Sequence, residues 1–147
     1  MAFRFALAPL LRLRQSVERQ RTLRLQEASL QVSCAQEMLA QIDGSISARE
    51  QSAARDLAGG QTGAELQFAS IVRENLLQFR EQLKANIHKL ELQREQAAVE
   101  YQQAYRDREL LENVRTRQHR LYQQEQSRRQ QRELDATFLL QRWHRRD

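Results

Sequence analysis

The sequence predicts an all-α protein, a long hairpin of two antiparallel helices that pack as a coiled coil. Charged residues make up 29% of the 147-residue chain and its mean hydropathy is −0.80, which is typical of long helices. The glycines occupy four positions and the only proline is Pro9, so the turns that a β-sheet needs are missing. Apolar residues recur at alternating spacings of three and four, which is the pattern of a helix–helix seam.

The first helix is expected over residues 9–57. Pro9 suits its first turn, because the backbone N–H that proline lacks is not needed there. A narrow apolar stripe follows, and it fits a two-helix seam better than a globular core. The stripe consists of Leu25, Ala28, Val32, Ala35, Leu39, Ile42 and Ile46.

Residues 58–64 are expected to form a loop. Gly59, Gly60 and Gly63 fall in this stretch, and each glycine costs about 1 kcal/mol relative to alanine inside a helix. The chain should therefore stop being helical here and turn back on itself.

The second helix is expected over residues 65–142. A single antiparallel register pairs Val32 with Leu90, Leu39 with Leu83, and Ile46 with Leu76, which supports the hairpin more strongly than either stripe alone. Arginines also occupy seam positions. Either their stems cover the seam while the guanidinium groups reach solvent, or they weaken the hairpin so that it can re-pair. These arginines are Arg49, Arg73, Arg94 and Arg108.

The two helices are unequal in length, so residues beyond Leu121 should overhang as a basic C-terminal segment. A polar helix without a packing partner is marginal in water, and we expect this segment to project as a single helix or to fray until a partner orders it. The whole chain, residues 1–147, is expected to be one coiled-coil domain.

Charge is segregated along the chain. Residues 1–24 carry a net charge of +5, residues 25–114 carry −5, and residues 115–147 carry +5. A hairpin brings the two basic ends together, and we call this feature the basic tip. It is either a solvated face or a contact for an acidic surface, anionic lipid or nucleic acid. Its arginines are Arg12, Arg14, Arg19, Arg21, Arg24, Arg115, Arg117 and Arg120.

The sequence does not favour an enzyme. The three histidines and Cys34 lack metal-ligand spacing, no phosphate-binding loop is present, and a two-helix rod offers no pocket for a nucleophile. We therefore expect no catalytic residue, metal, cofactor or small-molecule substrate. A single cysteine indicates a reducing compartment, and no apolar run approaches the roughly 20 residues of a membrane span or forms a signal peptide. The expected location is cytoplasmic.

Two other interpretations start from the basic segments. A basic DNA-binding coiled coil is conceivable, but Leu10, Leu13 and Val17 interrupt the basic stretch, which also carries no Asn to read adenine. The sequence thus does not favour nucleic acid as a partner. Association with a membrane surface through residues 138–140 and 143–146 would rest on few side chains.

The N-terminal segment is the most motif-like part of the chain. Residues 3–14 read Phe-Arg-Phe-Ala-Leu-Ala-Pro-Leu-Leu-Arg-Leu-Arg, and a long helix, a Gly-containing turn and a longer second helix follow. This arrangement resembles the FliJ family of flagellar export proteins. Injectisome stalk proteins of the YscO type are similar, so an injectisome counterpart or a generic coiled-coil tether remains an alternative.

The resemblance implies a non-enzymatic component of the flagellar type III protein export apparatus, with a fold similar to the gamma-subunit stalk of rotary ATPases. Such a protein inserts into the hexameric ring of the export ATPase and promotes its assembly and activity. It couples the ATPase and its regulator to the export gate protein FlhA, and it escorts export chaperones. The implied processes are flagellum biogenesis, motility and chemotaxis. The implied location is the cytoplasmic face of the inner membrane, with membrane association only through the apparatus.

The resemblance also implies two contact sites. The basic tip would enter the ATPase ring. The export-gate contact would be an apolar strip early in the second helix, although a wider local core under the Gly-rich loop would explain the same residues. The strip consists of Val72, Leu76, Phe79 and Leu83.

Overall fold

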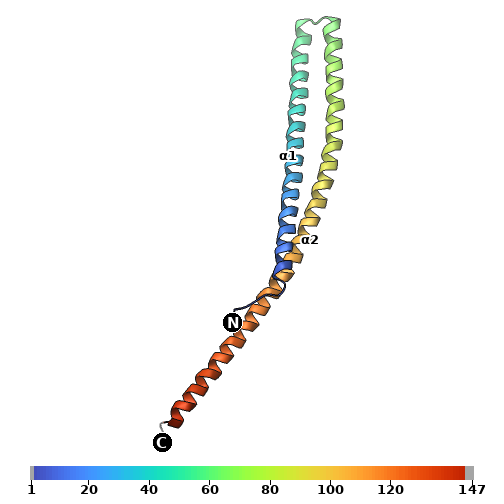
Figure 1. Ribbon diagram of the computed structural model, residues 1–147. Coiled ribbons are helices and arrows are strands. Elements are labelled where there is room, and N and C mark those ends of the chain that lie inside the picture. Colours follow the sequence, from blue (N-terminus) through green and yellow to red (C-terminus); the bar gives the residue numbers. More distant parts are fainter. Residues whose placement is uncertain (1, 145–147) are drawn as a thin grey trace. The chain divides into compact units, whose positions relative to one another are not determined.

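The structure is a computed structural model that describes residues 2–144 and consists of two long helices (Figure 1). Helix α1 spans Ala8–Gly59 with 52 residues, and helix α2 spans Gly63–His144 with 82 residues. No strand occurs among the described residues. The predicted all-α class and two-helix hairpin are confirmed.

The chain divides into two compact units, and both helices contribute to each. The loop unit comprises residues 20–102, and the terminal unit comprises residues 1–19 and 103–147. The expectation of one domain over the whole chain stays a prediction.

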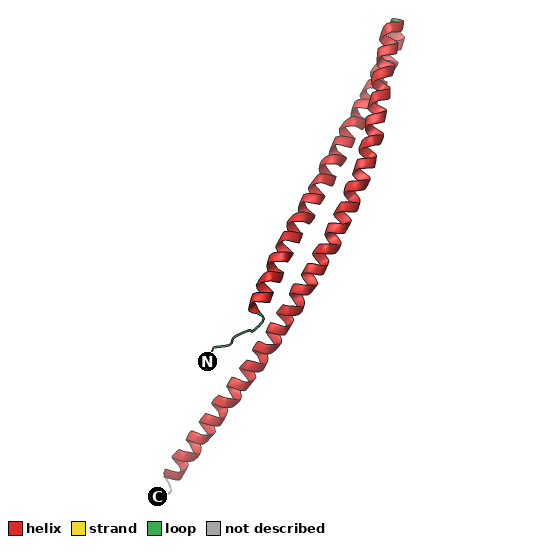
Figure 2. Ribbon diagram, turned by 45° about the vertical axis from the view of Figure 1, so that its right-hand side comes forward, coloured by secondary structure: helices red, strands yellow, loops and turns green. Residues whose placement is uncertain are grey.

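In the loop unit, α1 and α2 run side by side in opposite directions (Figures 1 and 2). The side chain of Val32 is only 1% exposed. The core contains Leu39 and Leu83, which the sequence register pairs, together with Ala35 and Ile87, which the same register sets opposite each other. The narrow apolar stripes are therefore the core of this unit. The core cluster comprises Ala35, Leu39, Ile42, Ile46, Leu83, Ile87 and Leu90.

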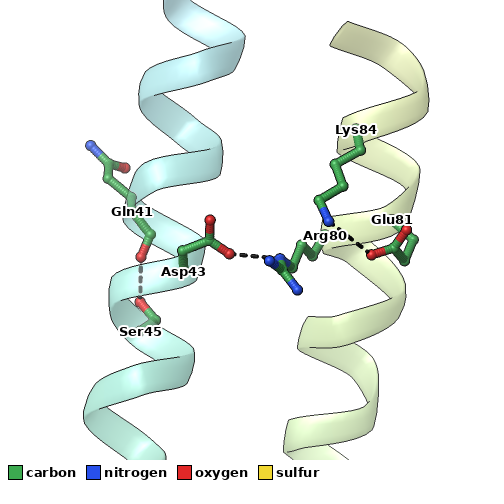
Figure 3. Close-up of polar contacts among 6 residues, drawn as sticks. All are labelled: Gln41, Asp43, Ser45, Arg80, Glu81 and Lys84. Atoms are coloured by element: carbon green, nitrogen blue, oxygen red, sulfur yellow. Dashed lines mark hydrogen bonds and ion pairs between the residues drawn. The ribbon is translucent and has the colours of Figure 1, made fainter. Parts of the chain in front are cut away.

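Ion pairs flank this seam. In Figure 3, Arg80 of α2 reaches across to α1, where its Nε lies 2.7 Å from Asp43 Oδ1 without hydrogen-bond alignment. About two turns nearer the loop, Arg73 Nη2 donates to Glu50 Oε1 at 2.9 Å. In the register that pairs Leu39 with Leu83, the two residues of each ion pair lie within one position of being directly opposite each other. The ion pairs at the edge of the seam thus fit the same helix register as the apolar pairs.

The turn between the helices is shorter than the predicted 58–64. Helix α1 continues to Gly59, and Gly60 then takes φ = +81°, the left-handed conformation in which glycine ends helices. Helix α2 begins at Gly63 because Thr62 caps it. Thr62 Oγ1 accepts a hydrogen bond from the Glu65 N–H at 3.4 Å, and Glu65 Oε2 accepts one from the Thr62 N–H at 3.0 Å. This reciprocal capping box pairs two backbone donors at the helix start.

In the terminal unit, the first turns of α1 pack on α2 around the buried Leu11 and Ala104. Residues 2–7 are not helical. The Phe3 ring lies edge-on to His119, at 5.0 Å between ring centroids, and its centroid lies 5.6 Å from that of Tyr122. Helix α2 continues unbroken to His144, and every residue from 127 to 144 is exposed. Within the described residues, the predicted overhang is therefore a single helix as far as His144.

The register can be tested by disulfide crosslinking. In a Cys34→Ser background, Leu39→Cys with Leu83→Cys should crosslink within one chain upon mild oxidation, because both side chains belong to the same core. Non-reducing electrophoresis would detect the crosslink as a faster-migrating monomer. The matched control is Leu30→Cys with Leu92→Cys, whose side chains are both exposed and should not crosslink within the chain. Crosslinks found only between chains would contradict the hairpin.

Candidate interaction surfaces

The predicted basic tip separates into two groups of arginines. The first group belongs to the terminal unit, is exposed, and forms no ion pair with any described residue. Such uncompensated charges create a local positive potential that is available to an external partner. This group consists of Arg12, Arg19, Arg115, Arg117 and Arg120.

The second group faces carboxylates of the same chain. In the terminal unit, Arg14 Nη1 donates to Asp107 Oδ2 at 3.1 Å. In the loop unit, Arg21 Nη1 lies 2.5 Å from Glu100 Oε2, and Arg24 Nη1 lies 4.0 Å from the same oxygen. These arginines therefore belong to the contact between the helices. Sequence reasoning missed these partners, although the antiparallel register already sets acidic residues opposite them.

Arg108 is a seam arginine whose guanidinium does not simply reach solvent. Its Nε contacts Glu18 Oε2, its Nη1 lies 2.5 Å from Glu112 Oε2, and its guanidinium carbon lies 4.9 Å from the centre of the Tyr105 ring. The side chains of Arg108 and Glu18 are only 18% and 17% exposed. The hydrogen bond to Glu18 raises the pKa of Arg108 above its ordinary value, although burial opposes this. The interpretation that only the stem packs is therefore wrong for Arg108.

The terminal unit contains a hollow of about 370 Å³, which we call the N-terminal hollow. Its lining comes from the segment before α1, the first turns of α1, and α2. The sequence signal for it is the Phe3-Arg4-Phe5 alternation shortly before the helix, which is no part of the apolar helix repeat. The hollow is lined by Phe3, Phe5, Ala8, Leu11, Arg12, Gln15 and Arg115.

The predicted export-gate strip is partly exposed. Val72 and Leu76 are half-buried, and the Phe79 side chain is 48% exposed. Leu83 is only 7% exposed and belongs to the core of the loop unit. A partner could therefore reach the first three residues, whereas Leu83 lies in the seam.

The loop end of the same unit carries further exposed apolar surface. A groove of about 640 Å³ lies there, and Leu57, Leu66 and Leu76 contribute to its lining. Phe68 and Ile71 are exposed as well, with 68% of Phe68 accessible. Phe68 and Ile71 therefore do not belong to a buried core, whereas the choice between a gate contact and a wider local core for Val72, Leu76 and Phe79 stays a prediction. Exposed apolar surface of this kind is typical of an interaction site.

The C-terminal apolar residues Phe138, Leu139, Leu140 and Trp143 are all exposed, whereas Arg145 and Arg146 lie outside the described residues. Neither helix contains, within residues 2–144, a stretch that is apolar enough to cross a bilayer. The same part of the chain has no cluster of three or more potential metal-ligating His, Cys, Asp or Glu side chains.

These features define a helical hairpin whose polar and apolar candidate sites lie on the surface of the described part. The chain matches the family model described as Flagellar FliJ protein over residues 3–147 and belongs to the FliJ family. It is thus a component of the flagellar export apparatus, and the family is not a known enzyme family. No curated protein and no solved structure matches the chain.

The division of the arginines can be tested by charge reversal. Arg21→Glu should lower the free energy of unfolding by about 1 kcal/mol, because it replaces an ion pair with repulsion from Glu100. Arg117→Glu, at an exposed position without an ion pair in the described region, should change it by less than about 0.5 kcal/mol. Urea denaturation followed by circular dichroism measures both. Equal changes in the free energy of unfolding for the two variants would show that the ion pair of Arg21 with Glu100 adds nothing to stability.

Proposed function

We propose that the chain is a stalk-like factor that inserts into the hexameric ring of the export ATPase and promotes its assembly and activity. The observation that carries this proposal is the exposed arginine group of the terminal unit, which has no counter-charge in the described part of the chain. A long helical pair with a basic end suits a ring whose inner surface is acidic.

Electrostatics would act mainly on encounter and orientation. Complementary charge raises association rates and fixes the approach, while adding less to the final affinity than apolar contacts do. Arg12 and Arg115 also border apolar side chains in the N-terminal hollow, so an oriented partner would meet apolar surface next. Positive charge beside apolar surface supports insertion into the ring better than positive charge spread over the surface alone would.

The same factor would couple the ATPase and its regulator to the export gate protein FlhA. The loop unit supports this part of the proposal, because Val72, Leu76 and Phe79 are partly exposed and Leu76 also lines the groove at the loop end. Leu83 would support them from the seam beneath. The proposed location is peripheral, at the cytoplasmic face of the inner membrane. Escort of export chaperones is proposed from family membership alone.

Ring insertion predicts that reversal of exposed charge abolishes stimulation of the ATPase. Arg12→Glu, Arg115→Glu and Arg117→Glu together should abolish stimulation of ATP hydrolysis without melting the helices. Each position is exposed, so each change should cost less than about 0.5 kcal/mol of stability. Stimulation by the unaltered chain should also weaken as salt rises, because exposed charges are screened beyond about 8–10 Å at physiological ionic strength.

The matched control carries the same charge change in the loop unit, as Arg49→Glu, Arg55→Glu and Lys89→Glu. These residues are exposed and lie outside the basic tip, so stimulation should persist. Full stimulation by the first variant would contradict insertion through the terminal unit.

The gate contact predicts that two apolar truncations weaken binding to FlhA. Val72→Ala with Phe79→Ala should reduce affinity tenfold or more, because burying a side chain of this size contributes about 1.5–3 kcal/mol. Calorimetric titration measures the affinity, and circular dichroism should show unchanged helicity. Leu92→Ala with Val99→Ala is the control, since both residues are exposed apolar positions on the same helix. If the first double variant unfolds, its side chains serve the core instead.

A further inference from the structure

The N-terminal hollow is built by three parts of the terminal unit. Phe3 and Phe5 come from the non-helical segment, Leu11 and Arg12 from the start of α1, and Arg115 from α2. The segment before α1 is held in place at both ends. Phe3 packs on the α2 rings of His119 and Tyr122, and the Ala8 N–H donates to the Phe5 carbonyl at 3.1 Å.

The lining of the hollow combines apolar surface with positive charge. Phe3, Phe5 and the 4%-exposed Leu11 supply apolar atoms, while Arg12 and Arg115 supply two exposed guanidinium groups. No carboxylate lines the hollow, and neither arginine forms an ion pair with any residue from 2 to 144. The cations of this hollow are thus available to an anion from another molecule.

The size and charge together restrict what can bind. A volume of about 370 Å³ is near the lower end for ligand sites, so it suits a side chain and its neighbour rather than a whole folded element. A guanidinium group binds a carboxylate through two parallel N–H···O bonds, which fixes the orientation of the ligand. A purely apolar ligand would leave both arginines without a partner, and a purely anionic ligand would leave the apolar lining wet.

We propose that the N-terminal hollow is a receptor for an apolar side chain flanked by a carboxylate, presented by the export ATPase. This inference rests on the proposed function and adds a defined site to it. Binding here differs from general attraction to a basic surface, because it requires Arg12 and Arg115 together with the apolar lining.

The chemistry of the hollow can be tested without the ATPase. In an NMR titration of the full chain, 4-phenylbutyrate should shift the backbone amides of Phe3, Leu11 and Arg115. Its neutral counterpart 4-phenylbutanol should bind at least threefold more weakly. Arg12→Gln with Arg115→Gln should remove this preference for the carboxylate, while Arg49→Gln with Arg55→Gln should keep it. Equal binding of acid and alcohol, or shifts elsewhere only, would overturn the inference.

The ATPase as the source of the ligand needs a second measurement. Arg12→Gln with Arg115→Gln should weaken ATPase binding at least tenfold, whereas the equally charged control, Arg49→Gln with Arg55→Gln, should change it less than twofold. A change of less than twofold in both variants would overturn the hollow as a receptor while leaving the proposed function intact, because Arg19, Arg117 and Arg120 keep their charge. Equal losses above twofold in both variants would overturn both. If the unaltered chain neither binds nor stimulates the ATPase, the proposed function and the ATPase as the ligand source both fail. The NMR titration then still decides the chemistry of the hollow.

Discussion

The apolar seam between α1 and α2 is the constraint on which the rest of the structure depends. Two helices can each bury only one stripe, so few side chains in the described region are buried, and Val32 is the most enclosed. Because the core is so small, apolar packing needs other interactions to help fix the register of α1 against α2. Arg80 with Asp43 and Arg14 with Asp107 provide them at the seam edge, although exposed ion pairs add only about 0.2–1 kcal/mol each.

A narrow seam also decides where interaction surfaces can form. Residues off the seam stay exposed, so the surface of each unit is set directly by its sequence. The N-terminal hollow lies beside the segment before α1, and the groove of the loop unit lies beside the loop. Each occurs where a non-helical segment meets the seam. Arg108 marks the opposite case, because Glu18 and Glu112 neutralise its charge within the terminal unit. Arginine position in the sequence is therefore a poor guide to which charges remain available.

The fold was predictable because it depends on a repeat. The spacing of Leu39, Ile42 and Ile46 specifies a helical stripe, and its match with Leu83 specifies the hairpin. The helix ends were less predictable, since the start of α2 depends on two hydrogen bonds between Thr62 and Glu65 rather than on apolar periodicity.

The candidate sites were predictable only in part. Sequence showed that the ends are basic, but it did not separate Arg21, which faces Glu100, from Arg117, which is exposed and forms no ion pair in the described region. The N-terminal hollow escaped prediction because it depends on the path of a non-repetitive segment, fixed by the packing of Phe3 on His119.

The exposed end of α2 has a thermodynamic consequence. From residue 127 to 144 the helix has no seam, so its backbone hydrogen bonds rely on intrinsic helix propensity and on local pairs such as Arg129 with Glu125. Helix–coil exchange in this segment then proceeds without opening the core, with a small free energy of its own. We therefore expect helicity to fall gradually in this segment before the seam unfolds in one cooperative transition, and a substitution at the seam changes the free energy of that transition alone.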